Sequence, residues 1–317
     1  MKTRAYLQLT KACNLKCKMC DFWKFGRENL DIEHFKKIID ILSLDGNIRG
    51  IIFWGGEPFL NQYIYDLIKY SKSKGFNVEI ITNGTIINKE KINEIIEDLD
   101  EIMFSIDSGI SYVHELIRGR NGVYNTIISN LEYMVSLRNT INLNLQINID
   151  VTLQKDNFNN FESIFELVKK YNLKINFDPV QILGYGNSIE GKDLLLTEEQ
   201  AFNFGEKFLK LKQENPISFI QSVDSVKRII RYFKGYKIEN YCKSLNSDIL
   251  IDPFGNVLRC WGDSKQLYNL LEKGFIDNTR LSMDKRCYSC GFTHVREDDY
   301  NMGYSITNDR FSIYDNI

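Results

Sequence analysis

The sequence predicts an α/β fold in which a parallel sheet curls into a full or partial barrel, followed by a smaller C-terminal domain. Three observations predict it. Short apolar runs alternate six times with amphipathic helical stretches over the first two thirds of the chain. Strand–helix units in series favour a parallel sheet with right-handed crossovers. After about residue 195 the alternation stops, which indicates a different kind of structure.

Each strand of the predicted barrel is a short apolar run of β-type residues, and each helix carries an apolar stripe at helical spacing. The second strand, GIIFWGG, enters a glycine turn. The clearest helix places Tyr124, Ile127, Leu131 and Val135 on one face. We expect strands at 6–10, 50–56, 78–84, 101–107, 143–153 and 173–182, with helices at 31–44, 60–70, 88–98, 124–135 and 158–168 between them.

The rest of the chain begins with two further helices and then becomes irregular. We expect helices at about 197–213 and 222–234, and two short strands around a Pro-Phe-Gly turn within 248–260. The remaining cysteines follow. We therefore expect a barrel domain over 1–195, a helical connection over 196–240, and a domain over 241–317 that needs a metal to hold it together.

The composition is that of an ordinary globular protein of 317 residues, with 43% hydrophobic and 26% charged residues. A formal net charge of −2 gives no reason to expect a nucleic acid as partner. No apolar run is long enough to span a membrane, and the start lacks the apolar region of a signal peptide. We therefore expect a cytoplasmic protein, in which seven cysteines indicate metal binding or reactivity rather than disulfides.

Three of these cysteines lie together in the stretch KACNLKCKMC, directly after the first strand. In barrels of this kind the chemistry sits at the carboxyl ends of the strands, so Cys13, Cys17 and Cys20 lie where a catalytic centre is expected. Structural zinc sites usually offer four ligands. Three thiolates on an iron–sulfur cubane leave one iron open, as a catalytic centre requires. A zinc knuckle completed by Asp21 or by a distant residue is the alternative.

The spacing of these cysteines resembles a known motif. The residues C-N-L-K-C-K-M-C match the CxxxCxΦC motif of the radical S-adenosylmethionine (radical SAM) superfamily, with Met19 at the Φ position. The resemblance implies a partial (β/α)6 TIM-like barrel and a [4Fe–4S] cluster on Cys13, Cys17 and Cys20. It further implies that SAM chelates the open iron and is cleaved to a 5′-deoxyadenosyl radical, which abstracts a hydrogen atom from the substrate.

Further motifs follow at the ends of the next three strands. Glycines permit a ligand to approach the backbone closely, and a glutamate can receive an ammonium group. Gly55-Gly56-Glu57-Pro58 resembles the GGEP motif of the family, Thr82-Asn83-Gly84 its TNG motif, and Ser105 with Asp107 its S-x-D. For each single residue a structural polar role is the alternative. The resemblance implies that SAM contacts Gly55, Gly56, Glu57, Pro58, Asn83, Ser105, Asp107 and Arg118, with Arg120 as the competing arginine.

The other four cysteines make a closed set that suits either Zn²⁺ or a second cubane. The pattern C-x₁₂-G-x₄-C, with Gly255 as its glycine, followed by C-x₂-C resembles the SPASM/Twitch extension of radical SAM enzymes in its single-cluster Twitch form. The resemblance implies an auxiliary [4Fe–4S] cluster that acts as an electron relay. With no thiol left to return a hydrogen atom, net oxidation is favoured. The four ligands are Cys242, Cys260, Cys287 and Cys290.

Three functions compete. The first is an oxidoreductase-type radical SAM enzyme that modifies a ribosomally synthesised peptide. The second is a dehydrogenase or rearrangement enzyme for a small molecule such as an aminosugar or a nucleotide. The third, a non-catalytic iron–sulfur electron carrier, has no use for GGEP. Peptide-modifying members often begin with a leader-binding domain, whereas this chain enters its first strand by residue 6.

The resemblance also implies partners and leaves the catalytic side chain open. An external one-electron reductant such as flavodoxin or ferredoxin is expected, together with a separate leader-peptide-binding protein if the substrate is a peptide. Among the three histidines, His114 beside the Arg118 segment and His294 after the last cysteine pair are the candidate catalytic residues.

Overall fold

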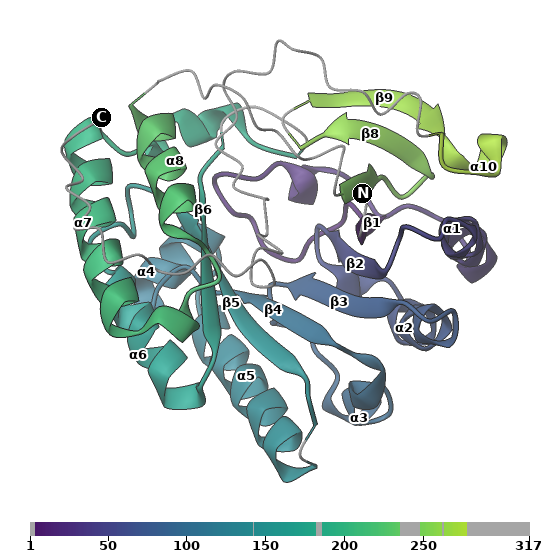
Figure 1. Ribbon diagram of the computed structural model, residues 1–317, viewed down its shortest axis with the longest axis horizontal. Coiled ribbons are helices and arrows are strands. Elements are labelled where there is room, and N and C mark those ends of the chain that lie inside the picture. The colour runs from purple at the N-terminus through teal and green to yellow at the C-terminus, as the bar shows by residue number, and fades with distance from the viewer. Residues whose placement is uncertain (1–3, 142, 182–185, 235–247, 262, 278–317) are drawn as a thin grey trace.

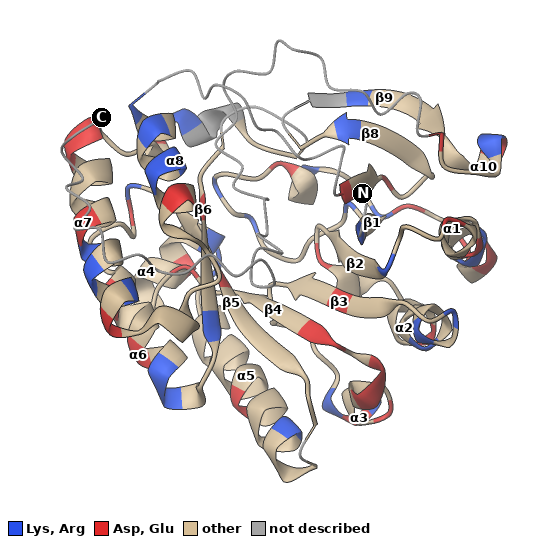
Figure 2. Ribbon diagram, viewed as in Figure 1, with Lys and Arg blue, Asp and Glu red and all other residues tan. Residues whose placement is uncertain are grey.

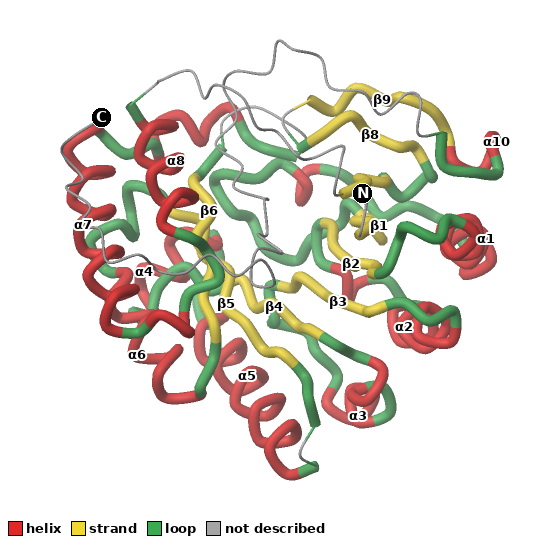
Figure 3. The backbone as a smooth tube through the Cα atoms, viewed as in Figure 1, coloured by secondary structure: helices red, strands yellow, loops and turns green. Residues whose placement is uncertain are grey.

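The computed structural model describes residues 4–141, 143–181, 186–234, 248–261 and 263–277. Its centre is one nine-stranded sheet with the strand order β6-β5-β4-β3-β2-β1-β7-β8-β9 (Figure 1). The sheet curves into a partial barrel, and the helices between the first six strands lie on its convex side (Figure 3). The predicted α/β fold with a parallel partial barrel is therefore confirmed.

All six predicted barrel strands are present, and each pairs in parallel with the next one in the chain. The alternation of side chains along them divides the residues between two environments. In β5 the residues Ile147, Ile149 and Val151 pack into the main hydrophobic core beneath the helices, while the residues between them face the concave side. The strands are β1 (Arg4–Thr10), β2 (Gly50–Gly55), β3 (Asn77–Thr82), β4 (Glu101–Ser105), β5 (Gln146–Leu153) and β6 (Lys174–Pro179).

The barrel helices begin at residues that cap them. The Asp31 side chain accepts a hydrogen bond from the His34 N–H at the start of α1, and Asn88 does the same for Lys91 at the start of α3. The predicted helix over 88–98 is shorter than expected, since α3 ends at Asn93 and a 3₁₀ turn follows. The helices are α1 (Ile32–Leu44), α2 (Ile64–Ser73), α3 (Lys89–Asn93), α5 (Val123–Thr140) and α6 (Phe161–Tyr171).

One helix of the barrel was not predicted. Helix α4 (Ser111–Arg118) is only eight residues long and buries His114, Ile117 and Arg118, so two of its three buried side chains are polar. It ends at Gly119, whose φ of 67° is the left-handed conformation that favours glycine.

Two predicted helices follow the barrel, α7 (Glu198–Glu214) and α8 (Val223–Phe233). Thr197 and Gln200 form a capping box at the start of α7, and the Ser222 side chain caps α8. Lysines and arginines alternate with acidic residues along α7 and along α1 and α2 (Figure 2). No helix in the described part of the chain is long and apolar enough to cross a membrane.

The described part of the C-terminal region extends the barrel sheet. Strand β7 (Asp248–Ile251) pairs in parallel with β1, and the buried ion pair between Arg4 and Asp248, 3.3 Å apart, joins the two strands. Strands β8 (Asn256–Cys260) and β9 (Asp263–Asn269) follow antiparallel, and α10 (Leu270–Lys273) ends the described chain segment. Strand β9 was not predicted because it is a polar edge strand. The predicted domain boundaries stay a prediction.

Candidate functional site

The cysteine stretch after β1 is held in place by the ends of two other elements. The Gly56 N–H donates to the Thr10 carbonyl (2.8 Å), and the Glu57 N–H donates to the Ala12 carbonyl (2.9 Å). From the other side, the Lys16 N–H donates to the carbonyl of Arg118 at the end of α4 (3.2 Å). The GGEP turn and α4 therefore fix the backbone from which the three cysteines project.

Glycine is required at both of these supports because the backbones nearly touch. A Cβ atom on Gly56 would lie 2.2 Å from the Ala12 carbonyl oxygen, and one on Gly119 would lie 2.1 Å from the Lys16 carbonyl oxygen. Such contacts are far inside van der Waals distance. We expected the GGEP glycines to admit a ligand, and the structure shows that they admit the cysteine stretch itself.

Glu57 is completely buried and links the ends of β2 and β3. Its Oε1 accepts hydrogen bonds from the Thr82 hydroxyl (2.7 Å) and the Phe59 N–H (3.1 Å), and its Oε2 accepts one from the Asn83 N–H (2.7 Å). Burial raises the pKa of Glu57 to about 7, although these three donors act in the opposite direction. The GGEP and TNG motifs thus form one hydrogen-bonded unit.

Asn83 connects this hydrogen-bonded unit to the cysteines. Its Nδ2 donates to the Asn14 side-chain oxygen (2.9 Å) and lies 3.8 Å from the Cys13 sulfur. Asn14 in turn donates to the Thr85 hydroxyl (2.7 Å). Three of the four predicted motifs therefore meet at Cys13.

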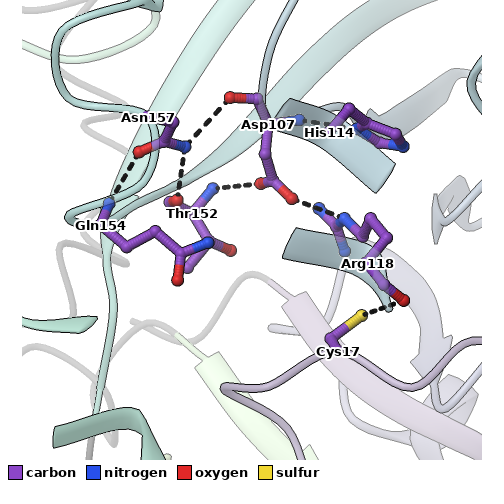
Figure 4. Close-up of polar contacts among 7 residues, drawn as sticks. All are labelled: Cys17, Asp107, His114, Arg118, Thr152, Gln154 and Asn157. Carbon is purple, nitrogen blue, oxygen red and sulfur yellow. Dashed lines mark hydrogen bonds and ion pairs between the residues drawn. The ribbon is translucent and has the colours of Figure 1, made fainter. Parts of the chain in front are cut away.

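The fourth motif reaches the cysteines through an arginine. The Arg118 Nε lies 2.6 Å from the Asp107 Oδ2, in an ion pair that is completely buried on the Asp107 side (Figure 4). Asp107 also accepts from the Thr152 N–H (2.9 Å), and the Cys17 sulfur lies 3.8 Å from the Arg118 carbonyl oxygen. The competing Arg120 is exposed and donates to the Asn14 carbonyl (3.1 Å). Of the two arginines, Arg118 is the one in the buried network.

The candidate His114 is buried within the same network. Its Nδ1 accepts from the Asp107 N–H (3.2 Å), and its ring meets Tyr124 edge-on at 5.7 Å. Burial, followed by the positive charge of Arg118, lowers the pKa of His114 to about 3, so the ring is neutral. His294, Cys242, Cys287 and Cys290 lie outside the described residues. Cys260 is half-buried at the end of β8, and the proposed second metal site stays a prediction.

The thiols of Cys13, Cys17 and Cys20 suit an iron–sulfur cluster better than a single metal ion. Cys17 is buried in a small apolar cluster with Leu15 and Met19, and Cys13 and Cys20 pack against the same cluster. A cubane binds each thiolate to a different iron and so needs its cysteines further apart than a mononuclear site does. Burial raises the pKa of Cys13 and that of Cys20 to about 12. Iron would supply the positive charge that stabilises these thiolates.

Several polar residues beside this network were not singled out from the sequence. The Asn157 amide donates to the Asp107 carbonyl (3.0 Å) and the Thr152 carbonyl (2.9 Å), and its oxygen accepts from the Gln154 N–H (2.8 Å; Figure 4). The period-two alternation of QINIDVTLQ could have indicated them, since it places Asp150, Thr152 and Gln154 on one side of β5.

Comparison with known proteins identifies the class. The Radical SAM superfamily profile matches residues 7–168, half of the chain, and the protein therefore belongs to the radical SAM superfamily. Membership implies one [4Fe–4S] cluster and SAM. A curated relative, the Fe-coproporphyrin III synthase of Methanosarcina barkeri, is 30% identical over 199 residues, which cover 61% of this chain and 47% of the relative.

Two further proteins are similar. The antilisterial bacteriocin subtilosin biosynthesis protein AlbA of Bacillus subtilis is 34% identical over 129 residues, covering 39% of this chain and 28% of AlbA. The structure of Streptococcus suis SuiB bound to its precursor peptide SuiA has a TM-score of 0.67 at 14% identity, covering 87% of this chain and 65% of SuiB. The match thus spans less than two thirds of each of these three proteins, and the last one shows the fold alone.

Proposed function

We propose that this protein is a radical SAM enzyme that cleaves SAM reductively and oxidises its substrate. The observation that carries the proposal is the convergence of three strand-end motifs on the stretch that holds Cys13, Cys17 and Cys20, in a chain of this superfamily. We assign these three cysteines to the [4Fe–4S] cluster, with one iron left for SAM. When bound, the cluster and SAM supply a 5′-deoxyadenosyl radical that abstracts a hydrogen atom.

The chain itself positions the cofactor. Residues at the ends of β2 to β4 contact the cysteine stretch directly or through Asn83 and Arg118, so we assign to them the contacts with SAM. Arg118 is already paired with Asp107. We therefore assign the pair as a unit to SAM binding, with the positive charge of Arg118 shared between the Asp107 carboxylate and the carboxylate of SAM. The assigned contacts are Gly55, Gly56, Glu57, Pro58, Asn83, Ser105, Asp107 and Arg118.

For the C-terminal region we infer a Twitch-type domain over 241–317 with an auxiliary [4Fe–4S] cluster on Cys242, Cys260, Cys287 and Cys290. Cys260 is the ligand whose surroundings the structure describes, at the end of a strand that is joined through β7 to β1. A cluster there receives the electron that a substrate radical loses on oxidation. Flavodoxin or ferredoxin supplies the first electron.

A ribosomally synthesised peptide is the substrate class we favour, because AlbA, which matches at 34% identity, is named for the biosynthesis of a bacteriocin. A small molecule is the second candidate, favoured by the match to Fe-coproporphyrin III synthase. We expect the substrate to stimulate SAM cleavage. The peptide and the small-molecule alternatives are therefore tested by adding a candidate substrate of each class and measuring that stimulation.

The test uses the full-length protein, reconstituted anaerobically with iron and sulfide and incubated with SAM and dithionite. We expect 5′-deoxyadenosine to form, and Cys17→Ala to lose at least about 100-fold of this activity, because the cluster lacks a ligand. Protein treated identically without iron is the control. About eight irons per chain support two cubanes, whereas about four irons and one zinc contradict the electron relay.

A further inference from the structure

Two aspartates lie side by side on the concave face of the barrel. The alternation that buries Ile149 and Phe177 under the helices turns Asp150 on β5 and Asp178 on β6 to the opposite side, where both stay partly accessible. Asp150 lies opposite Ser105 of β4 in the strand register. Asp150 is therefore one strand, and Asp178 two strands, away from the residues assigned to SAM at the end of β4.

A single amide lies between the two carboxylates. The Asn176 Nδ2 donates to the Asp150 Oδ1 (2.6 Å) and to the Asp178 Oδ2 (3.2 Å). Burial, followed by the charge of Asp178, raises the pKa of Asp150 to about 7. Among the described residues, no lysine or arginine side chain forms an ion pair with Asp150. A carboxylate in this position is unfavourable until a cation neutralises it.

Gln154 provides a second, independent observation. The residue is 1% exposed, yet neither its amide oxygen nor its amide nitrogen finds a hydrogen-bond partner among the residues that the structure describes. Gln154 directly follows β5, and its amide extends toward the side chain of Thr152 (Figure 4), which pairs in register with Asp178. A buried amide without partners costs on the order of 1–3 kcal/mol per group, so it calls for a ligand.

We propose that Asp150, Asp178 and Gln154 form a substrate subsite that binds an ammonium group. The carboxylates accept the N–H donors of the ammonium and neutralise its charge, while the Gln154 amide bonds a neighbouring carbonyl or hydroxyl of the same molecule. The proposal deepens the proposed function, on which it rests for the identity of the neighbouring SAM site. A lysine side chain of a peptide and an amino sugar are the two sources of such a group.

The test compares probes that differ only in the amine, by calorimetry on the reconstituted full chain with SAM bound. N-acetyl-lysine methylamide against N-acetyl-norleucine methylamide represents the peptide, and glucosamine against glucose represents the sugar. We expect the cationic member of one pair to bind at least ~10-fold more tightly than its neutral counterpart. The pair that shows the preference identifies the source.

Variants then locate the binding site. Asp150→Asn and Asp178→Asn keep the shape and remove one charge each, and we expect either to abolish the preference for the amine. Gln154→Leu should weaken the binding of both probes of the preferred pair. Glu101→Gln is the matched control: it removes a carboxylate that accepts from Asn148 at the other end of the same sheet, and should leave the preference unchanged.

The proposal would be overturned by equal binding of amine and neutral probe, by no binding of either cationic probe at 10 mM (~10-fold above a millimolar Kd), or by a preference that survives Asp150→Asn. A parallel loss of SAM affinity in Asp150→Asn would also overturn it, since the pair would then belong to the SAM site. Formation of 5′-deoxyadenosine under dithionite is measured separately. It tests the proposed function, which stands or fails independently of the amine preference.

Discussion

Arg118 and Asp107 form a buried ion pair, 2.6 Å between Nε and Oδ2, that joins α4 and the carboxyl end of β4 beside Cys17. The pair connects the cysteine stretch to β5 through Thr152 and positions His114 through the Asp107 backbone. The pair therefore joins three elements of the site, and Arg118 is the side chain to replace first.

Arg118→Gln should destabilise the protein by about 3–5 kcal/mol, because it leaves Asp107 buried with an uncompensated charge. Chemical denaturation measures the change. Arg120→Gln is the control. Because Arg120 is exposed, its replacement should lower the free energy of unfolding by less than about 1 kcal/mol. The double variant with Asp107→Asn should cost less than the sum of the two single variants. Equal effects of Arg118→Gln and Arg120→Gln would show that the ion pair has no special weight.

Gly56→Ala should impair loading of the cluster. The added methyl group would lie 2.2 Å from the Ala12 oxygen and 2.3 Å from the Lys11 oxygen, so the cysteine stretch must move. We expect a loss of stability of about 1–3 kcal/mol and a clear drop in iron content after reconstitution. Gly46→Ala is the matched control, since a Cβ there meets nothing within 4 Å. Normal iron content in Gly56→Ala would refute this account of the GGEP turn.

Asp150→Asn should change how stability depends on pH. The folded-state pKa of Asp150, about 7, lies above its ordinary 3.8, so the folded protein binds the extra proton between these values. The free energy of unfolding therefore falls as pH rises from about 4 to 7, and this loss of stability is complete above pH 7. At pH 8 the variant should be more stable than the wild type by about 1–3 kcal/mol, and at pH 4 the two should agree.

Urea denaturation at pH 4, 6 and 8 measures this prediction. Because the same substitution is expected to abolish amine binding, it would gain stability and lose binding together, as is common for substitutions in binding sites. A variant that is less stable than the wild type at pH 8 would indicate that Asp150 is already neutralised within the folded chain.

Removal of iron should leave thiols of low reactivity. With pKa values of about 12, Cys13 and Cys20 are almost entirely protonated at pH 8. Alkylation by iodoacetamide should be at least about 100-fold slower than that of a free thiol of ordinary pKa, since the thiolate is the nucleophile. Mass spectrometry of the digested protein measures each site. Rates as fast as those of free glutathione would contradict the burial of these side chains.

Much of this fold was predictable because its strands are buried on the helix side and carry continuous apolar periodicity, as in β5. Helix α4 was missed because the side chains that it buries, His114 and Arg118, are polar. The motif residues were recognised individually, but their mutual bonding was not. That Glu57 holds Thr82 and Asn83, and that Arg118 pairs with Asp107, depends on contacts between strand ends that only the folded chain brings together.

The pair of carboxylates formed by Asp150 and Asp178 could not be predicted from the sequence, for a related reason. Asp150 and Asp178 are 28 residues apart, and neither belongs to a motif; only the β5–β6 register places them beside Asn176. Gln154 was equally inconspicuous, because a missing hydrogen-bond partner is a property of the packed structure.

The decisive measurement is electron paramagnetic resonance of the dithionite-reduced, reconstituted protein with and without SAM. It tests whether Cys13, Cys17 and Cys20 hold a [4Fe–4S] cluster to which SAM binds. We expect the spectrum of a reduced [4Fe–4S] cluster whose g-values shift when SAM binds to the open iron, and the loss of this signal in Cys13→Ala. Because an auxiliary cluster would add its own signal, the component that responds to SAM decides: a spectrum in which no component shifts with SAM, or one whose SAM-responsive component survives in Cys13→Ala, would contradict the assignment of Cys13, Cys17 and Cys20.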